Sequence, residues 1–199
     1  MVNNIHFKEI YDAVKINKET NKKSLLVLLL ICMLTAFYPS DMYYYRNMER
    51  DASTHVLFVN KYLRHVNTVA QYAIPIILFD KIGIVQIACI GVATLISTHG
   101  LKRVLNDVYI RDTRLGERPS RIESTHNSPS GHSSLAASAM AFIMLRYGWV
   151  HGIYLVPITL LTMAARVLLK AHTVSAVLSG AALGIMIALL LTSKYKSRK

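Results

Sequence analysis

Charged residues are scarce in this sequence, and acidic residues are the scarcest. Asp, Glu, Lys and Arg make up 17% of the 199 residues, whereas a typical soluble domain has about 25%. The 11 acidic residues stand against 23 Lys and Arg, so the formal charge is +12. This charge alone would suggest a nucleic-acid partner, but the apolar residues occur in long blocks that leave no soluble core beneath a basic patch. We therefore expect a membrane protein with no nucleic-acid partner.

Cysteine, proline and glycine are also sparse. The sequence has two Cys, five Pro and nine Gly, which excludes a collagen and a disulfide-stapled scaffold. Cys32 and Cys89 both lie inside apolar blocks, which argues against a disulfide between them. The hydrophobic share of 53% excludes a disordered chain, and the mean hydropathy is +0.34. No convincing metal cluster is present, so we expect neither a metal nor another cofactor.

Apolar blocks recur along the chain at lengths that suit a bilayer. A span needs about 20 mostly apolar helical residues, or fewer where a helix end is buried in protein. The blocks are Leu25–Tyr38, Val69–Phe79, Ile82–Ser97, Ser134–Leu145, Ile153–Leu169 and Val174–Leu191. They predict an all-α integral membrane protein with six transmembrane helices. The polar stretch from Thr54 before the second block could form an interfacial helix.

Charges outside the blocks predict the orientation. Residues 1–23 combine an apolar stripe with many lysines, which is typical of an amphipathic helix on a cytoplasmic surface, although a frayed basic tail fits too. The chain also ends in a lysine-rich tail, so the positive-inside rule places both termini in the cytoplasm. Residues 24–199 then form the six-span domain, with segments 41–66 and 100–132 facing outward. About half of the basic residues fall on this outer side, where an anionic ligand would explain them; the role of 41–66 is left open.

Three polar clusters fall on the predicted outer side. The first runs from Arg111 to Pro119 and offers guanidinium groups suited to phosphate oxygens. The second, Ser128–Ser134, places small residues and a histidine at a helix start, where backbone N–H groups bind anions. The third joins Arg166 to His172 at the membrane boundary. Taken singly, these clusters have alternative interpretations: a solvated loop, a capped helix start, and a snorkelling arginine beside an interfacial histidine.

Taken together, the clusters resemble a known signature. Arg-x6-Arg-Pro, Pro-Ser-Gly-His and Arg-x5-His occur in the order found in the type-2 phosphatidic acid phosphatase superfamily, which includes integral-membrane lipid phosphatases. The resemblance covers residues 98–190, with the signature itself in 98–180. It implies that His172 attacks phosphorus to give a phosphohistidine and that His132 is the general acid. It also implies that the phosphoryl oxygens are bound by Arg111, Arg118, Ser130, Gly131 and Arg166.

The sequence departs from the family pattern, Lys-x6-Arg-Pro, Pro-Ser-Gly-His and Ser-Arg-x5-His-x3-Asp, at three positions. Arg111 stands at the lysine position, and Ala165 at the serine position. Ala176 stands where the family has the aspartate that would orient His172, because residues 172 and 176 share a helix face. We expect Ala176 to disable the activity. An engineered Asp-to-Ala change, a naturally altered member and rescue by Asp112, Glu117 or Glu123 all stay open.

The predicted substrate is a phosphorylated lipid at the outer, periplasmic face of a bacterial inner membrane. The segment Thr98–Lys102, with Asn106 and Arg111, is most similar to the branch that includes lipid A 1-phosphatases. Undecaprenyl pyrophosphate, phosphatidylglycerol phosphate and phosphatidic acid are alternative substrates, and transfer to an acceptor other than water is an alternative reaction. A non-catalytic binder of anionic lipids and a small transporter or channel subunit are alternatives of other classes. Nothing in the sequence indicates the oligomeric state.

Overall fold

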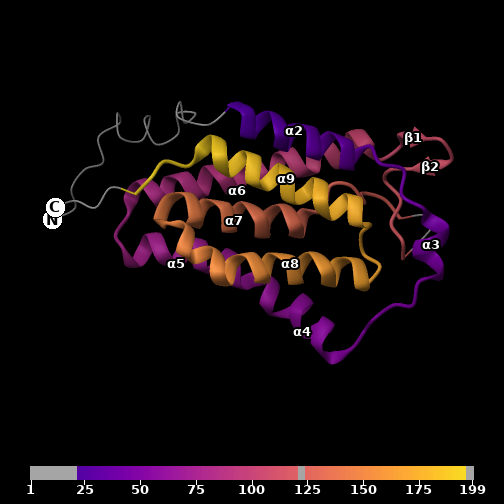
Figure 1. Ribbon diagram of the computed structural model, residues 1–199, viewed down its shortest axis with the longest axis horizontal. Helices are drawn as coiled ribbons and strands as arrows, with labels where there is room; N and C mark the ends of the chain where they lie inside the picture. The colour runs from indigo at the N-terminus through magenta and orange to yellow at the C-terminus, as the bar shows by residue number, and fades with distance from the viewer. Residues whose placement is uncertain (1–21, 121–123, 196–199) are drawn as a thin grey trace.

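The computed structural model describes residues 22–120 and 124–195, so all but the last two residues of the predicted amphipathic segment 1–23 lie outside the described residues. The described residues are mainly helical (Figure 1). The helices are α2 (Lys22–Ala36), α3 (Met42–Asn47), α4 (Thr54–Lys61), η1 (Leu63–His65), α5 (Val66–Ile77), α6 (Lys81–Leu105), α7 (Gly131–Tyr147), η2 (Trp149–His151), α8 (Gly152–Leu168) and α9 (Val174–Leu191). A short antiparallel ribbon pairs β1 (Tyr109–Ile110) with β2 (Thr113–Arg114).

Every predicted apolar block forms a helix, so the all-α prediction is confirmed. Three helical stretches are long and apolar enough to cross a membrane: α6, Trp149–Leu168 and α9. The six spans and the cytoplasmic termini stay predictions. The third block was expected to end at Ser97, whereas α6 continues to Leu105. In this continuation Thr98 and Lys102 face the protein interior, where they are buried.

Helix α7 lies at the centre of the bundle and contacts α5, α6, α8 and α9 (Figure 1). Its side chains Phe142 and Ile143 are fully buried against apolar residues of α6, α8 and α9. On the α5 side, the buried amide of Asn67 donates to the carbonyl groups of Ala136 and Leu155, both at 3.3 Å. The core therefore fixes α7, which carries the Pro-Ser-Gly-His segment at its start.

Helices α7 and α9 approach each other closely through small residues. A Cβ at Gly180 would meet the carbonyl oxygen of Ser130, and one at Gly184 would meet the carbonyl oxygen of Ser134. The backbone N–H of Ser130 also donates to the carbonyl of Ala176 at 2.8 Å. Small residues allow such close backbone packing between membrane helices. As a result, the starts of α7 and α9 lie side by side at one end of the bundle, which we call the site end.

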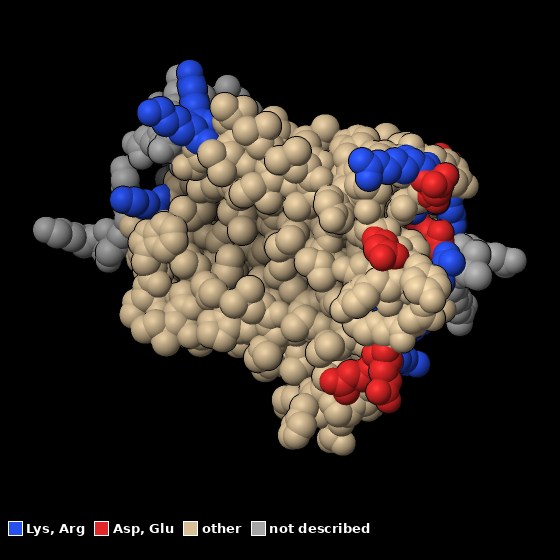
Figure 2. Space-filling model, turned by 45° about the vertical axis from the view of Figure 1, so that its right-hand side comes forward, with Lys and Arg blue, Asp and Glu red and all other residues tan. Residues whose placement is uncertain are grey.

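Charged side chains gather at two ends of the face shown in Figure 2, with a broad band free of them between. At the end opposite the site end, the buried Arg146 donates to the carboxylate of Asp80 through Nε and Nη2. The carbonyl of Arg146 also accepts from the N–H of Tyr195 at 2.9 Å, beyond the end of α9. The uncharged middle band is the surface expected for a protein surrounded by lipid.

The predicted outward segment 41–66 covers part of the site end. The hydroxyl of Tyr45 in α3 accepts from the N–H of Val174 at 2.9 Å. Lys170 donates to the carbonyl groups of Arg46 and Met48, at 2.6 and 3.0 Å. This segment, whose role the sequence leaves open, is therefore a structural part of the site end.

Candidate active site

His172 lies in the connection between α8 and α9 and is buried, with 2% of its surface exposed. The backbone N–H groups of Ala171 and His172 both donate to the carbonyl of Arg166, at 3.0 and 3.2 Å. This closing turn explains the Arg-x5-His spacing. The Nδ1 atom of His172 lies 2.8 Å from the carbonyl oxygen of Asn127. Because a carbonyl can only accept, Nδ1 carries the proton in this pair, and Nε2 of the neutral ring keeps its lone pair.

The surroundings of His172 favour the neutral ring. Burial, followed by the positive charges of Lys102, Arg118 and Arg166, holds the pKa of His172 well below its ordinary value. The bond to Asn127 acts in the opposite direction and does not outweigh them. A neutral imidazole with an unprotonated Nε2 is the form that can act as a nucleophile.

The start of α7 presents backbone N–H groups at the same end. Ser130 is the N-cap residue and is fully buried, and its hydroxyl accepts from the hydroxyl of Ser133 at 3.1 Å. The first N–H groups of a helix have no acceptor within the helix. The N–H groups of Gly131 and His132 fall in this first turn, so they are suited to binding an anion.

His132 contacts an arginine that sequence reasoning missed. Nη1 of Arg64, in η1, lies 3.0 Å from Nε2 of His132. Arginine can only donate, so Nε2 accepts, and the ring of His132 is neutral in this arrangement. Arg166 and Lys102 also lie close enough to His132 to interact with it electrostatically.

Lys102, Arg118 and Arg166 form the cationic part of the site. Lys102 and Arg118 both donate to the carbonyl of His126, at 3.0 and 3.4 Å, and Arg166 donates to the side chain of Asn60 at 2.8 Å. The Nε atoms of Arg118 and Arg166 are buried and have no hydrogen-bond partner among the described residues. A buried donor without a partner is costly. These two N–H groups are therefore available to donate to a bound anion.

Comparison with known proteins identifies the family of this site. The family model described as "PAP2 superfamily" matches residues 82–199, which is more than half of the chain. The chain belongs to the PAP2 superfamily. The family that the signature predicts is thus confirmed.

Curated relatives cover most of the chain. The chain is 44% identical to the "Lipid A 1-phosphatase" of Helicobacter pylori strain ATCC 700392 / 26695 over 139 residues. This alignment covers 70% of the chain and 72% of the relative. The protein of the same name from strain J99 is 44% identical over 136 residues, 68% of the chain and 70% of the relative. The "Lipid A 4'-phosphatase" of strain J99 is 32% identical over 115 residues, 55% of the chain and 58% of the relative. No solved structure matches the chain significantly.

The structure brings together most of the residues that the PAP2 signature predicts. Arg118 and Arg166 act on His172, Arg166 acts on His132, and Ser130 and Gly131 begin the helix that carries His132. Their roles in binding and catalysis stay predictions.

Arg111 is the exception, and the structure does not place it in this group. It is exposed in the turn between β1 and β2, with a φ of +53°. The cations that act on His172 do not include it. The ribbon turns Arg111 out toward solvent, away from these cations, and its role in binding phosphate stays a prediction.

Lys102, which the sequence did not single out for the site, is one of the three cations that act on His172. Thr94, Thr98 and Lys102 recur every four residues on one face of α6, and all three are buried. The four-residue spacing could have revealed this, because i and i+4 residues share a helix face. It was missed because the predicted span ended at Ser97.

The side chain at Ala176 offers no acceptor to His172. Ala176 is fully buried, and its carbonyl accepts from the N–H of Ser130 and the hydroxyl of Ser179. Of the acids considered for rescue, Glu117 forms an ion pair with Arg46 and Asp112 is exposed, whereas Glu123 lies outside the described residues. Within the described ranges, no group of three or more His, Cys, Asp or Glu is placed to hold a metal.

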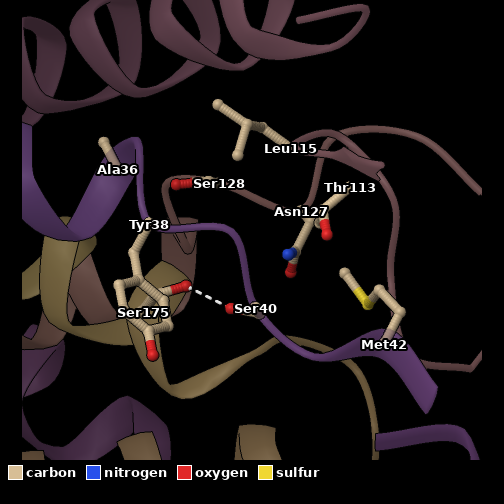
Figure 3. A pocket seen from close by; sticks show the side chains of 9 residues that line it. All are labelled: Ala36, Tyr38, Ser40, Met42, Thr113, Leu115, Asn127, Ser128 and Ser175. Carbon is tan, nitrogen blue, oxygen red and sulfur yellow. Dashed lines mark hydrogen bonds between the residues drawn. The ribbon is translucent and has the colours of Figure 1, made fainter. Parts of the chain in front are cut away.

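A small pocket lies beside Asn127 and Ser128 (Figure 3). Tyr38, Ser40 and Met42 contribute to its lining, and the hydroxyl groups of Ser40 and Ser175, also in the lining, form a hydrogen bond of 2.8 Å. Its volume of about 10 Å³ is close to the minimum for one water molecule. This pocket therefore has room for a water and none for a lipid headgroup.

Proposed function

We propose that this PAP2 protein removes the 1-phosphate of lipid A at the outer face of the bacterial inner membrane, through a phosphohistidine intermediate. PAP2 membership and the named relatives indicate a lipid phosphatase hydrolase. The observation that carries the mechanism is a neutral His172 among Lys102, Arg118 and Arg166, two of which have buried N–H groups without partners. Such a site is complete only when a phosphoryl group is bound.

Binding would use two buried N–H groups that lack partners among the described residues, together with nearby cationic and neutral donors. The Nε–H groups of Arg118 and Arg166 would donate to two phosphoryl oxygens, and Lys102 would add a point charge. The hydroxyl of Ser130 and the N–H of Gly131 would add neutral donors. Phosphoryl transfer depends mainly on positioning and on stabilising the charge of the transferring group, and these groups supply both.

In the first step, Nε2 of His172 attacks phosphorus while the bond between phosphorus and the lipid oxygen breaks. The leaving oxygen takes a proton from His132. The free structure has His132 neutral, since Arg64 donates to its Nε2. The negative charge of a bound phosphoryl group competes for Arg64 and favours the imidazolium, which can then act as the acid.

In the second step, water attacks the phosphohistidine. The bond between phosphorus and Nε2 breaks, His132 takes a proton from the attacking water, and orthophosphate leaves. His172 returns to its neutral form with Nδ1 still bonded to Asn127. An acceptor alcohol in place of water would give phosphotransfer instead.

The test is phosphate release by the purified chain in detergent. The substrates are bisphosphorylated lipid A, undecaprenyl pyrophosphate and phosphatidylglycerol phosphate, and product masses show which lipid A phosphate is lost. We expect release from the 1-position, together with an acid-labile phosphoryl group on the protein. Loss of the 4'-phosphate or turnover of another lipid would overturn the proposed substrate and position of attack. Lipid binding without phosphate release would favour the alternative of a non-catalytic lipid binder.

Replacing His172 by Gln tests the nucleophile directly. We expect turnover to fall by at least about 10³-fold, as for other enzymes that lose their nucleophile, and the acid-labile phosphoryl group to disappear. His151→Gln is the matched control, because His151 lies in η2 at the opposite end of the bundle and its loss should leave turnover unchanged. Equal activity of the two variants would remove His172 from the mechanism.

A further inference from the structure

We propose that the main-chain carbonyl of Asn127 orients His172 in this chain, in place of the carboxylate that the family pattern has at position 176. On this view Asn127 is a positioning residue, and the chain is active with Ala176. The inference rests on the proposed function, because it concerns the nucleophile of that reaction. It replaces the expectation that Ala176 disables the enzyme.

The first argument is the geometry of the bond. A neutral histidine has one N–H donor, and a catalytic histidine must place it so that the other nitrogen faces the substrate. The Nδ1 donor of His172 already has an acceptor, the carbonyl of Asn127 at 2.8 Å, and both residues are buried. The expected loss of activity assumed a ring without any acceptor.

The second argument is that the acceptor is held in place. The amide of Asn127 donates to the hydroxyl of Thr173 at 3.2 Å, and its side-chain oxygen accepts from the N–H of Thr173 at 3.2 Å. The N–H of Asn127 donates to the carbonyl of Gly116 at 2.9 Å. Asn127 thus binds the residue that directly follows His172, so the carbonyl and the ring keep their relative position.

The third argument concerns the neighbouring carbonyl. The carbonyl of His126 accepts from Lys102 and Arg118, and the next carbonyl, of Asn127, accepts from His172. His126 has a φ of +68°, in the left-handed region, and its N–H donates to the side chain of Asn106 at 3.2 Å. Two successive carbonyl groups therefore hold the nucleophile and two of the cations.

A carbonyl differs from a carboxylate because it carries no net charge. It fixes the tautomer of His172 but stabilises an imidazolium less than a carboxylate would. The carbonyl therefore leaves the pKa of His172 low, as burial and the three cations dictate. An Ala176→Asp variant would favour the charged ring, so the acid limb of kcat/KM would move to higher pH.

The experiment compares the unmodified chain with Ala176→Asp, Asn127→Ala and Asn67→Ala, using phosphate release from lipid A across a pH series. Asn67 is the matched control, since it is a fully buried asparagine of α5 that bonds away from His172. We expect Ala176→Asp to give no increase in rate and to shift the acid limb upward. We expect Asn127→Ala to lower kcat by about 10- to 100-fold, as when the partner of a metal-bound histidine is lost, with little change in KM. Asn67→Ala should lower stability without this loss of kcat.

The outcomes separate the two proposals. An unmodified chain that is inactive while Ala176→Asp is active would overturn the role of Asn127 and leave the phosphatase assignment standing. Inactivity of both on all three lipids would overturn the phosphatase assignment itself. Equal loss of kcat in Asn127→Ala and Asn67→Ala would show a general folding effect and overturn the positioning role. Ala176 is buried and tightly packed, so should Ala176→Asp fail to fold, the unmodified chain and the two asparagine variants still decide the question.

Discussion

At the scale of single residues, the site depends on which cation reaches the interior. Lys102 and Arg111 are both basic and are nine positions apart in the sequence. One is buried on the inner face of α6, and the other is exposed in the turn of the ribbon. The spacing of the family motif predicts Arg111 as a cation of the site, whereas the geometry of α6 brings Lys102 into the interior beside His172.

This contrast gives a direct prediction. Lys102→Met keeps the length of the side chain and removes its charge, and we expect kcat/KM to fall by about 10²-fold or more, since one preorganised donor contributes on that order. Arg111→Gln should leave kcat/KM nearly unchanged because the residue lies outside the site. Steady-state kinetics on lipid A measures both, and the reverse ranking would restore Arg111 to the site.

Burial of a neutral His172 also predicts how stability depends on pH. The folded protein holds the pKa of His172 well below 6.5, whereas the unfolded chain has a value near 6.5. Below this pH the unfolded state binds a proton that the folded state does not, so acid favours unfolding. The stability from this residue is present above pH 6.5 and falls by at most about 1.4 kcal/mol per pH unit below it.

Thermal unfolding in detergent between neutral and acidic pH measures this effect. We expect the melting temperature to fall with acidification and His172→Gln to fall less steeply. An unchanged slope in the variant would mean that other groups cause the acid sensitivity.

At the scale of elements, the close contact of α7 with α9 places the two histidine-bearing segments together. The hydropathy of each helix predicts that it forms, but only side-chain size predicts which helices touch. Glycine at 180 and 184 leaves the space that the backbone of α7 occupies. The relative position of His132 and His172 therefore depends on the lack of a side chain at positions 180 and 184 of α9.

Adding one methyl group tests this contact. In Gly184→Ala the new Cβ would meet the carbonyl of Ser134, and we expect destabilisation of about 1–3 kcal/mol with a loss of activity. Gly100→Ala is the control, because Gly100 is exposed in α6 and has no neighbouring atoms at its Cβ position. That change should stabilise the helix by up to about 1 kcal/mol. Chemical or thermal unfolding in detergent gives both values.

At the scale of the whole molecule, the sequence predicts the helices well and the contacts between distant segments poorly. Long apolar blocks locate α9 at the expected residues, because burial in lipid and in protein both favour such a run. Residues such as Arg64, Asn60 and Asn127 could not be predicted as parts of the site. Their role depends on the folding of segments 54–65 and 124–130 against α7 and α8, which no local pattern encodes.

The cations of the site were only partly predictable for the same reason. Arg118 and Arg166 follow from the family signature, whereas Lys102 requires knowing that α6 continues beyond its apolar part. The acceptor for His172 lies 45 residues away in the chain. This acceptor is a backbone oxygen, which every residue has, so a sequence motif cannot identify it.

The cationic group has one further consequence for turnover. Lys102, Arg64, Arg118 and Arg166 act on the two histidines, and among the described residues no carboxylate is one of the charges that act on His172. Fixed positive charge of this kind attracts any small oxyanion, whether or not a lipid is attached to it. We therefore expect orthophosphate to leave the site slowly. Free phosphate should then compete with the substrate, and product release rather than bond cleavage should limit the steady-state rate.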